Sequence, residues 1–179
     1  MKTKNLVSGA LLLAIGYLLH LICPPLFLGM KPDLLLAMMF IAIILNGENF
    51  SSVLVIGIAS GIITAITTTF PGGQIPNFLE KIFTAIFLYG LIKIMGNKIN
   101  NNIKVCIISI LGTLCSGTLF LTFAYIIVGL PGSFTALFIS VVLPAIIINT
   151  VAVFFLYKVV IKSMTLVHIN KWRVASPKY

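Results

Sequence analysis

The run Phe70-Pro71-Gly72-Gly73-Gln74-Ile75-Pro76-Asn77 separates two long apolar segments, residues 52–69 and 78–95. Its two glycines accept backbone angles that other residues avoid. Its two prolines fix φ and remove N–H donors, so we expect a stiff, polar connection. Such a loop between two helices of bilayer length is a good place for a binding site, although a simple connector has the same composition.

Composition identifies the class of protein to which these segments belong. The 179 residues are 60% hydrophobic and only 8% charged, which leaves too little polar surface to cover a soluble globule. Apolar runs recur from end to end, so no soluble domain is predicted. We expect an all-α membrane protein. Residues 1–162 are predicted to form a compact bundle of six transmembrane helices, and residues 163–179 a basic cytoplasmic tail.

Six apolar runs are the candidate transmembrane helices. A run of eighteen residues, such as the first, spans roughly 27 Å as a helix, close to the thickness of the hydrocarbon core. The second run has only twelve residues, so it must begin near Pro32, tilt little or use flanking residues to cross. Pro144 is expected to kink the sixth run and free a backbone carbonyl. The runs are residues 6–23, 34–45, 52–69, 78–95, 105–129 and 134–161.

The basic residues predict the orientation of these spans, because cytoplasmic loops hold the excess of Lys and Arg. With six spans, ten of the twelve basic residues fall on one side, and the other side has only Lys31 and Lys81. Both termini are therefore expected in the cytoplasm, with the connections that contain residues 31–33, 70–81 and 130–133 facing outward. The net charge of +9 then has a topological origin, and no nucleic-acid partner is expected.

The outward-facing side gathers the main candidate binding residues as two lysine–carboxylate pairs and two amides. A zwitterion such as a free amino acid needs both signs close together, because its ammonium seeks a carboxylate and its carboxylate seeks lysine or backbone N–H groups. The alternative is that the four charges are interfacial residues whose stems extend to water. These candidates are Lys31, Asp33, Gln74, Asn77, Glu80 and Lys81.

Aromatic and amide side chains add to this set. Asn149 is an amide in mid-span that could shape a cavity wall or make an interhelical hydrogen bond. Aromatic residues near the outer ends of the spans could line a pocket or form an interfacial belt. They are Phe70, Phe78, Phe123, Tyr125 and Phe134.

Small residues recur at a spacing of four in two spans, which lets helices approach closely. For Gly57, Gly61 and Ala65 we predict packing inside the bundle. For Ala10 and Ala14 a docking surface for another membrane subunit is the alternative.

The sequence lacks the residue patterns that metal binding and ATP hydrolysis require. There is no H-E-x-x-H, the three cysteines have no metal-ligand spacing, and no P-loop occurs, so we expect no metal and no cofactor. No acidic residue is predicted in the middle of a span, where proton-driven carriers commonly have one. Uphill transport would therefore take its energy from a partner. The alternatives are a stand-alone secondary transporter, a channel, or a membrane enzyme that uses His20 with an outer carboxylate.

Three motifs resemble those of the bacterial tryptophan transporter family and occur in the same order along the chain. They are Gly29-Met30-Lys31-Pro32-Asp33, residues 68–77, and Val128-Gly129-Leu130-Pro131-Gly132. Leu143-Pro144 with Asn149-Thr150 matches as well, and the likeness runs to about Lys162. The resemblance implies a substrate-binding S component of an energy-coupling factor transporter, powered by a transmembrane coupling subunit and two ATPase subunits. It also implies that Ala10 and Ala14 contact the coupling subunit.

The resulting hypothesis is a multi-pass subunit of the bacterial plasma membrane that captures L-tryptophan or a related indole amino acid. Either outer carboxylate would meet the ligand's ammonium and either lysine its carboxylate. Gln74 or Asn77 would meet an amide or the indole N–H. Phe70 and other outer-end aromatics would meet the ring, and Asn149 completes the expected site.

Overall fold

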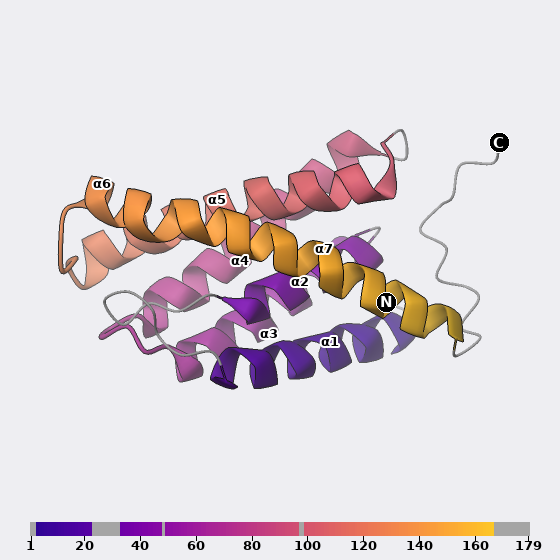
Figure 1. Cartoon of the computed structure of the whole chain (residues 1–179). Coiled ribbons are helices and arrows are strands. Elements are labelled where there is room, and N and C mark those ends of the chain that lie inside the picture. The colour runs from indigo at the N-terminus through magenta and orange to yellow at the C-terminus, as the bar shows by residue number, and fades with distance from the viewer. Residues whose placement is uncertain (1–2, 23–32, 48, 97–98, 167–179) are drawn as a thin grey trace.

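The computed structural model describes residues 3–22, 33–47, 49–96 and 99–166, and within them it contains helices and turns but no strand. These residues form a bundle of six helical segments, since the last three elements run on from one another (Figure 1). α1 begins and α7 ends at the same end of the bundle (Figure 1). The elements are α1 Thr3–Ile22, α2 Leu34–Asn46, α3 Phe50–Thr67, α4 Gln74–Met95, α5 Asn101–Ile127, α6 Phe134–Leu137, η1 Phe138–Val142 and α7 Leu143–Leu166.

α2 forms the centre of the core. It packs against α1, α3, α4, α5 and α7, and every side chain from residue 35 to residue 43 is at most 2% exposed. A helix that is apolar on all sides is stable only when it is surrounded. Because the other helices enclose α2, it does not have to match the thickness of a bilayer by itself, which explains why the second apolar run is so short.

The outer surface of the bundle is apolar. Among the described residues, three helical stretches are long and apolar enough to cross a membrane, Phe50–Thr67, Asn101–Ile127 and Phe134–Thr165, and Val7–Ile22 and Leu34–Asn46 are shorter apolar helices. Large apolar side chains such as Ile66 and Ile94 are 79% and 86% exposed. Such a surface fits a protein embedded in hydrocarbon. Which end faces the cytoplasm stays a prediction, as does the division at residue 162, where α7 continues to Leu166.

The loop motif is shorter than the sequence predicts, because its second half is helical. α4 begins at Gln74, and the Asn77 N–H donates to the Gly73 carbonyl at 2.9 Å. Pro76 falls in the first turn of this helix, where a missing N–H costs nothing. Gly72 has a φ of 72°, which accounts for a glycine in the turn. The loop that remains is residues 68–73.

The irregularity expected at Pro144 takes the form of a π turn. The Leu143 N–H donates to the Phe138 carbonyl, five residues back, and η1 covers the five residues before Leu143. Pro144 has no N–H to continue the ladder, so the extra residue in the turn absorbs the break. Val141, Val142 and Ala145, on either side of the break, face a pocket.

The small residues of α3 close the bundle within one chain, as predicted. A Cβ on Gly57 would lie 2.6 Å from the Cβ of Ala85, and one on Gly61 would lie 2.9 Å from the Phe78 carbonyl, so both glycines abut α4. Ala10 and Ala14 are exposed on α1.

Gly57→Ala is expected to lower the free energy of unfolding by about 1–3 kcal/mol, because α3 and α4 must separate to admit the methyl group. The measurement is unfolding in detergent micelles. Gly90→Ala is the matched control on α4, since nothing lies within 4 Å of its added Cβ. Equal stability of the two variants would contradict this account of the α3–α4 contact.

Candidate functional site

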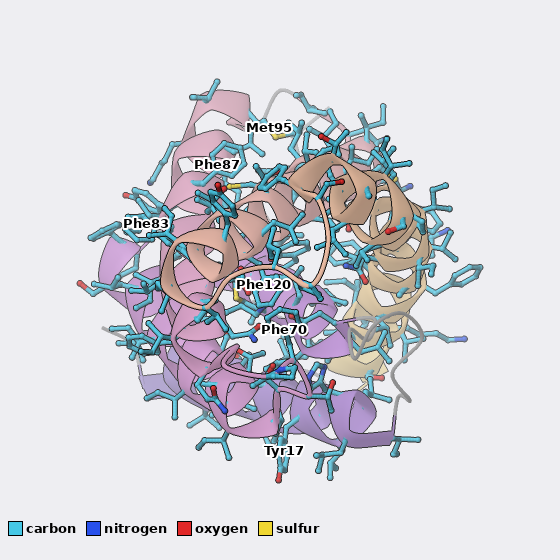
Figure 2. All side chains as sticks on the ribbon, turned by 90° about the vertical axis from the view of Figure 1, so that its left-hand side faces the viewer. Tyr17, Phe70, Phe83, Phe87, Met95 and Phe120 are labelled. Carbon is cyan, nitrogen blue, oxygen red and sulfur yellow. The ribbon has the colours of Figure 1, made fainter. Side chains whose placement is uncertain are left out.

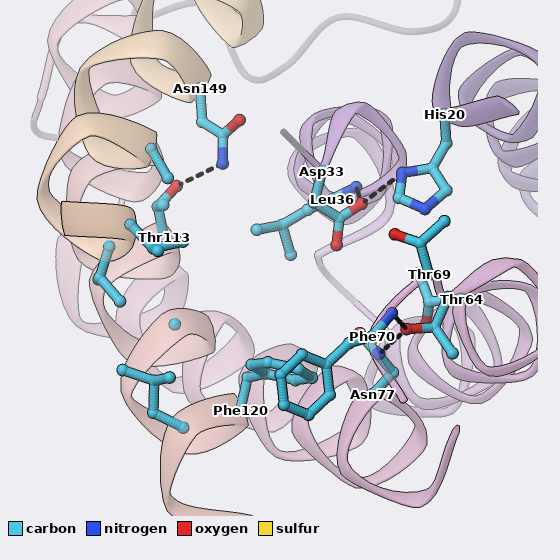
Figure 3. Close-up of a pocket in the computed structure, with 16 residues that line it drawn as sticks. His20, Asp33, Leu36, Thr64, Thr69, Phe70, Asn77, Thr113, Phe120 and Asn149 are labelled. Atoms are coloured by element: carbon cyan, nitrogen blue, oxygen red, sulfur yellow. Dashed lines mark hydrogen bonds and ion pairs between the residues drawn. The ribbon is translucent and has the colours of Figure 1, made fainter. Parts of the chain in front are cut away.

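A pocket opens among α1, α2, α3, the start of α4, α5, η1 and α7, and is bordered by the loop at residues 68–73 (Figure 3). It lies toward the end of the bundle that Figure 2 shows face-on, where Phe70 and Phe120 are near the middle and Tyr17 points outward. Its volume is about 120 Å³. At about 30 Å³ per water molecule in the liquid, this is room for about four water molecules, which is more than a single ion needs.

Asp33 supplies the carboxylate of the pocket. It caps α2, because its Oδ1 accepts from the Leu36 N–H at 2.9 Å, and its Oδ2 accepts from Lys81 Nζ. His20 Nδ1 lies 3.5 Å from Oδ1. Burial opposes ionisation of this carboxyl group, but Lys81 and His20 outweigh it and hold the pKa of Asp33 below its ordinary value. The pocket therefore contains a carboxylate that can receive an ammonium group.

A buried charge cluster, defined here as Asp33, Glu80 and Lys81, lies beside the pocket. The Lys81 ammonium pairs with both carboxylates, and Glu80 Oε2 also accepts from Ser116 Oγ at 2.7 Å. Glu80 and Lys81 are each 1% exposed and do not line the pocket. Their burial rules out the alternative in which they extend to water at an interface. Glu80 lies in the second turn of α4, near the start of that helix and not in its middle, because the helix begins at Gln74.

Asn77 holds the loop to α4. Its Nδ2 donates to Thr68 Oγ1 at 3.0 Å and to the Gly73 carbonyl at 2.8 Å. Thr68 Oγ1 also accepts from the Phe70 N–H at 3.2 Å. These bonds fix the loop and set the position of Phe70 at the edge of the cavity.

Two aromatic rings form the base of the pocket. Phe70 and Phe120 meet edge to face, with ring centroids 5.5 Å apart and planes at 80° (Figure 3). Of the five aromatic candidates, Phe70 alone lines the pocket. Phe123 pairs with Phe83 instead, and Tyr125 is 66% exposed.

Asn149 lies opposite Asp33 in the pocket (Figure 3). It is 1% exposed, and its Nδ2 donates to Thr113 Oγ1 at 3.4 Å. Its Oδ1 is buried and has no hydrogen-bond partner. Both readings of this residue therefore hold, since it makes an interhelical bond and also forms a cavity wall.

The predicted site residues divide into three groups. Asp33, Phe70, Asn77 and Asn149 line one pocket, with Glu80 and Lys81 beside it. Gln74 is exposed at the start of α4 and does not line the pocket. Lys31 lies outside the described residues.

Twelve of the sixteen lining residues were not predicted as binding residues. Six of the twelve are polar or aromatic, and that character alone does not distinguish them from core residues. They are His20, Thr64, Thr68, Thr69, Thr113 and Phe120. In the described part of the chain, no three His, Cys, Asp or Glu side chains are placed to hold a metal ion.

Comparison with known proteins agrees with this chemistry. The family model described as tryptophan transporter TrpP matches residues 2–165. The chain belongs to this family. A probable tryptophan transport protein of Clostridium perfringens is 51% identical over 172 residues, covering 91% of this chain and 94% of the relative. One of Bacillus subtilis is 48% identical over 160 residues, covering 89% and 92%. No solved structure matches the chain.

A further relative, a probable tryptophan transport protein of Clostridium acetobutylicum, is 46% identical over 167 residues, which cover 93% of this chain and 97% of the relative. Because the chain belongs to a tryptophan transporter family, it is a transport protein. The alternative of a membrane enzyme is therefore rejected. With the apolar helices described above, membership of this family also indicates a location in a membrane.

Lys81→Met is expected to lower the free energy of unfolding by about 3–5 kcal/mol, because it leaves two buried carboxylates without their cation. Lys93→Met, the same change at an exposed position of α4, is expected to cost at most about 1 kcal/mol. Unfolding in one detergent compares the two variants. A loss in Lys81→Met no larger than in Lys93→Met would refute the structural role of the cluster.

Proposed function

We propose that this member of the tryptophan transporter family is a substrate-capture subunit whose pocket binds L-tryptophan. The observation that carries the proposal is one cavity that holds both a carboxylate, Asp33, and an edge-to-face aromatic pair, Phe70 and Phe120. A free aromatic amino acid has the complementary parts, an ammonium group and an apolar ring. All three relatives described above are named as probable tryptophan transport proteins, which agrees with this ligand.

In the proposed complex, the ligand's ammonium binds Asp33 and its ring lies against Phe70 and Phe120. Lys81 already neutralises two carboxylates and is 1% exposed, so it positions Asp33 and does not take the ligand's carboxylate. Lys31, two residues before Asp33 in the sequence, is the cation left for that role. The hydroxyl groups of Thr68 and Thr69 provide further polar contacts.

We propose that a separate ATP-driven module supplies the energy, through a transmembrane coupling subunit and two ATPase subunits in the bacterial plasma membrane. The sequence has no P-loop of its own. Ala10 and Ala14 lie exposed on α1, where their small side chains permit close approach of another helix. Both termini are proposed to face the cytoplasm, with the pocket toward the outside.

Stand-alone secondary transport is the second candidate. Glu80 favours it, because a buried carboxyl group within a helix of a membrane protein is typical of ion-driven carriers. Uptake by the purified chain alone, in liposomes with an ion gradient, would support this candidate over the module-dependent one.

The proposed ligand predicts saturable, selective binding of L-tryptophan to the purified protein. Trp172 is the only tryptophan of the chain, so Trp172→Phe provides a background without indole fluorescence from the protein. In that background Asp33→Asn is expected to weaken tryptophan binding about 10- to 100-fold. This factor corresponds to the free energy that a hydrogen bond to a charged group contributes to binding. Asparagine also caps helices well, so α2 keeps its first turn.

Indole-3-propionate is the control ligand, because it has the ring and the carboxylate but no ammonium. Its affinity is expected to be the same for both proteins. Tight binding of a vitamin, or of no amino acid in a panel, would reject the tryptophan assignment.

The proposed partner predicts that Ala10→Leu and Ala14→Leu leave tryptophan binding unchanged but reduce uptake in cells about tenfold or more, because bulky side chains hold the coupling helix away. Gly90→Leu, at an open position of α4, is the matched control and should keep uptake. Normal uptake by both alanine variants would place the coupling surface elsewhere.

A further inference from the structure

We propose that Asn149 accepts a hydrogen bond from the indole N–H of the bound amino acid, and that this bond sets the preference for tryptophan over amino acids whose ring has no N–H. The inference rests on the proposed function. It assigns a specific role to the oxygen of a side chain amide whose nitrogen already donates to Thr113.

The first argument is the unpaired oxygen. Asn149 is 1% exposed and lines the pocket, and its Oδ1 has no hydrogen-bond partner. Because its Nδ2 donates to Thr113, the amide is held with Oδ1 on the cavity side (Figure 3). A buried acceptor without a partner is costly, so a ligand that supplies a donor here gains affinity.

Other unpaired oxygens do not lie in this position. Among the described residues, Asn46 Oδ1, Ser52 Oγ and Ser109 Oγ are also buried without a partner, and none of these residues lines the pocket. Asn149 therefore combines an unpaired acceptor with a place in the lining of the cavity.

The second argument is the separation of charge from this acceptor. Asp33 and His20 lie on one side of the cavity, and Asn149 lies on the other side (Figure 3). An ammonium group binds most strongly at the carboxylate. Close to Asn149 in the sequence, Val142 and Ala145 give the cavity an apolar wall. A neutral acceptor beside an apolar wall suits a donor carried by an apolar ring.

The indole group meets this requirement, because its nitrogen is a donor only and belongs to an aromatic ring. In the proposed complex, the ammonium lies at Asp33 and the ring against Phe70 and Phe120, so that the N–H of the ring would be directed at Asn149. A ligand without the N–H leaves Oδ1 unpaired, which is expected to weaken binding about 10- to 100-fold.

The test compares L-tryptophan with 3-benzothienylalanine, in which sulfur replaces the N–H and the ring keeps its shape. Calorimetric titration of the full-length wild-type protein is expected to show binding of the sulfur analogue at least about tenfold weaker. Equal affinities would overturn the role of Asn149 and leave the tryptophan assignment standing. Binding of neither compound would overturn both.

The variant Asn149→Leu is expected to bring the ratio of the two affinities close to one, by weakening tryptophan and not the analogue. Thr150→Val is the matched control on the same turn of α7, since the Thr150 hydroxyl donates to its own helix at Ile146. It should keep the wild-type ratio. An unchanged ratio in Asn149→Leu would refute the proposal, and the wild-type comparison decides the question if this variant does not fold.

Discussion

The position of one buried ammonium group governs the site. Lys81 lies between the carboxylates of Asp33 and Glu80, so it joins the start of α2 to α4, and Ser116 extends the connection to α5. Three charges in an apolar bundle are stable only when each has a partner, which restricts how these helices can be arranged. The pocket is formed where this arrangement leaves one carboxylate, Asp33, open to the cavity.

The enclosed helix α2 gives that carboxylate a rigid base. Its side chains are buried by five surrounding elements, so Asp33, which caps its start, cannot move far without disturbing the core. The loop at residues 68–73 has a different support, because hydrogen bonds from Asn77 and to Thr68 hold it against the start of α4. The site thus combines a charge fixed by the core with an aromatic ring, Phe70, fixed by a short loop.

The pocket and the apolar surface serve different parts of transport. The pocket has one carboxylate, several hydroxyl groups and two rings among its lining residues, a composition that suits the small zwitterion proposed above. The buried cluster has one positive and two negative groups, so an ammonium at Asp33 would bring its formal charge to balance. Binding of a cationic group at Asp33 would in this way be linked to the contact between α2 and α4 that Lys81 makes.

The sequence by itself determined the membrane class, the six helical segments and their approximate limits, because apolar runs of bilayer length and the prolines and glycines between them are local signals. It also selected Asp33, Phe70, Asn77 and Asn149, which stand out as polar or turn residues in an apolar chain. Only the tertiary structure decided that Lys81 pairs with a carboxylate 48 residues away, that Gln74 points outside, and that His20, Thr113 and Phe120 line the cavity. The physical reason is that ion pairing and burial depend on which helices pack against one another. The separation of two residues in the sequence does not determine that packing.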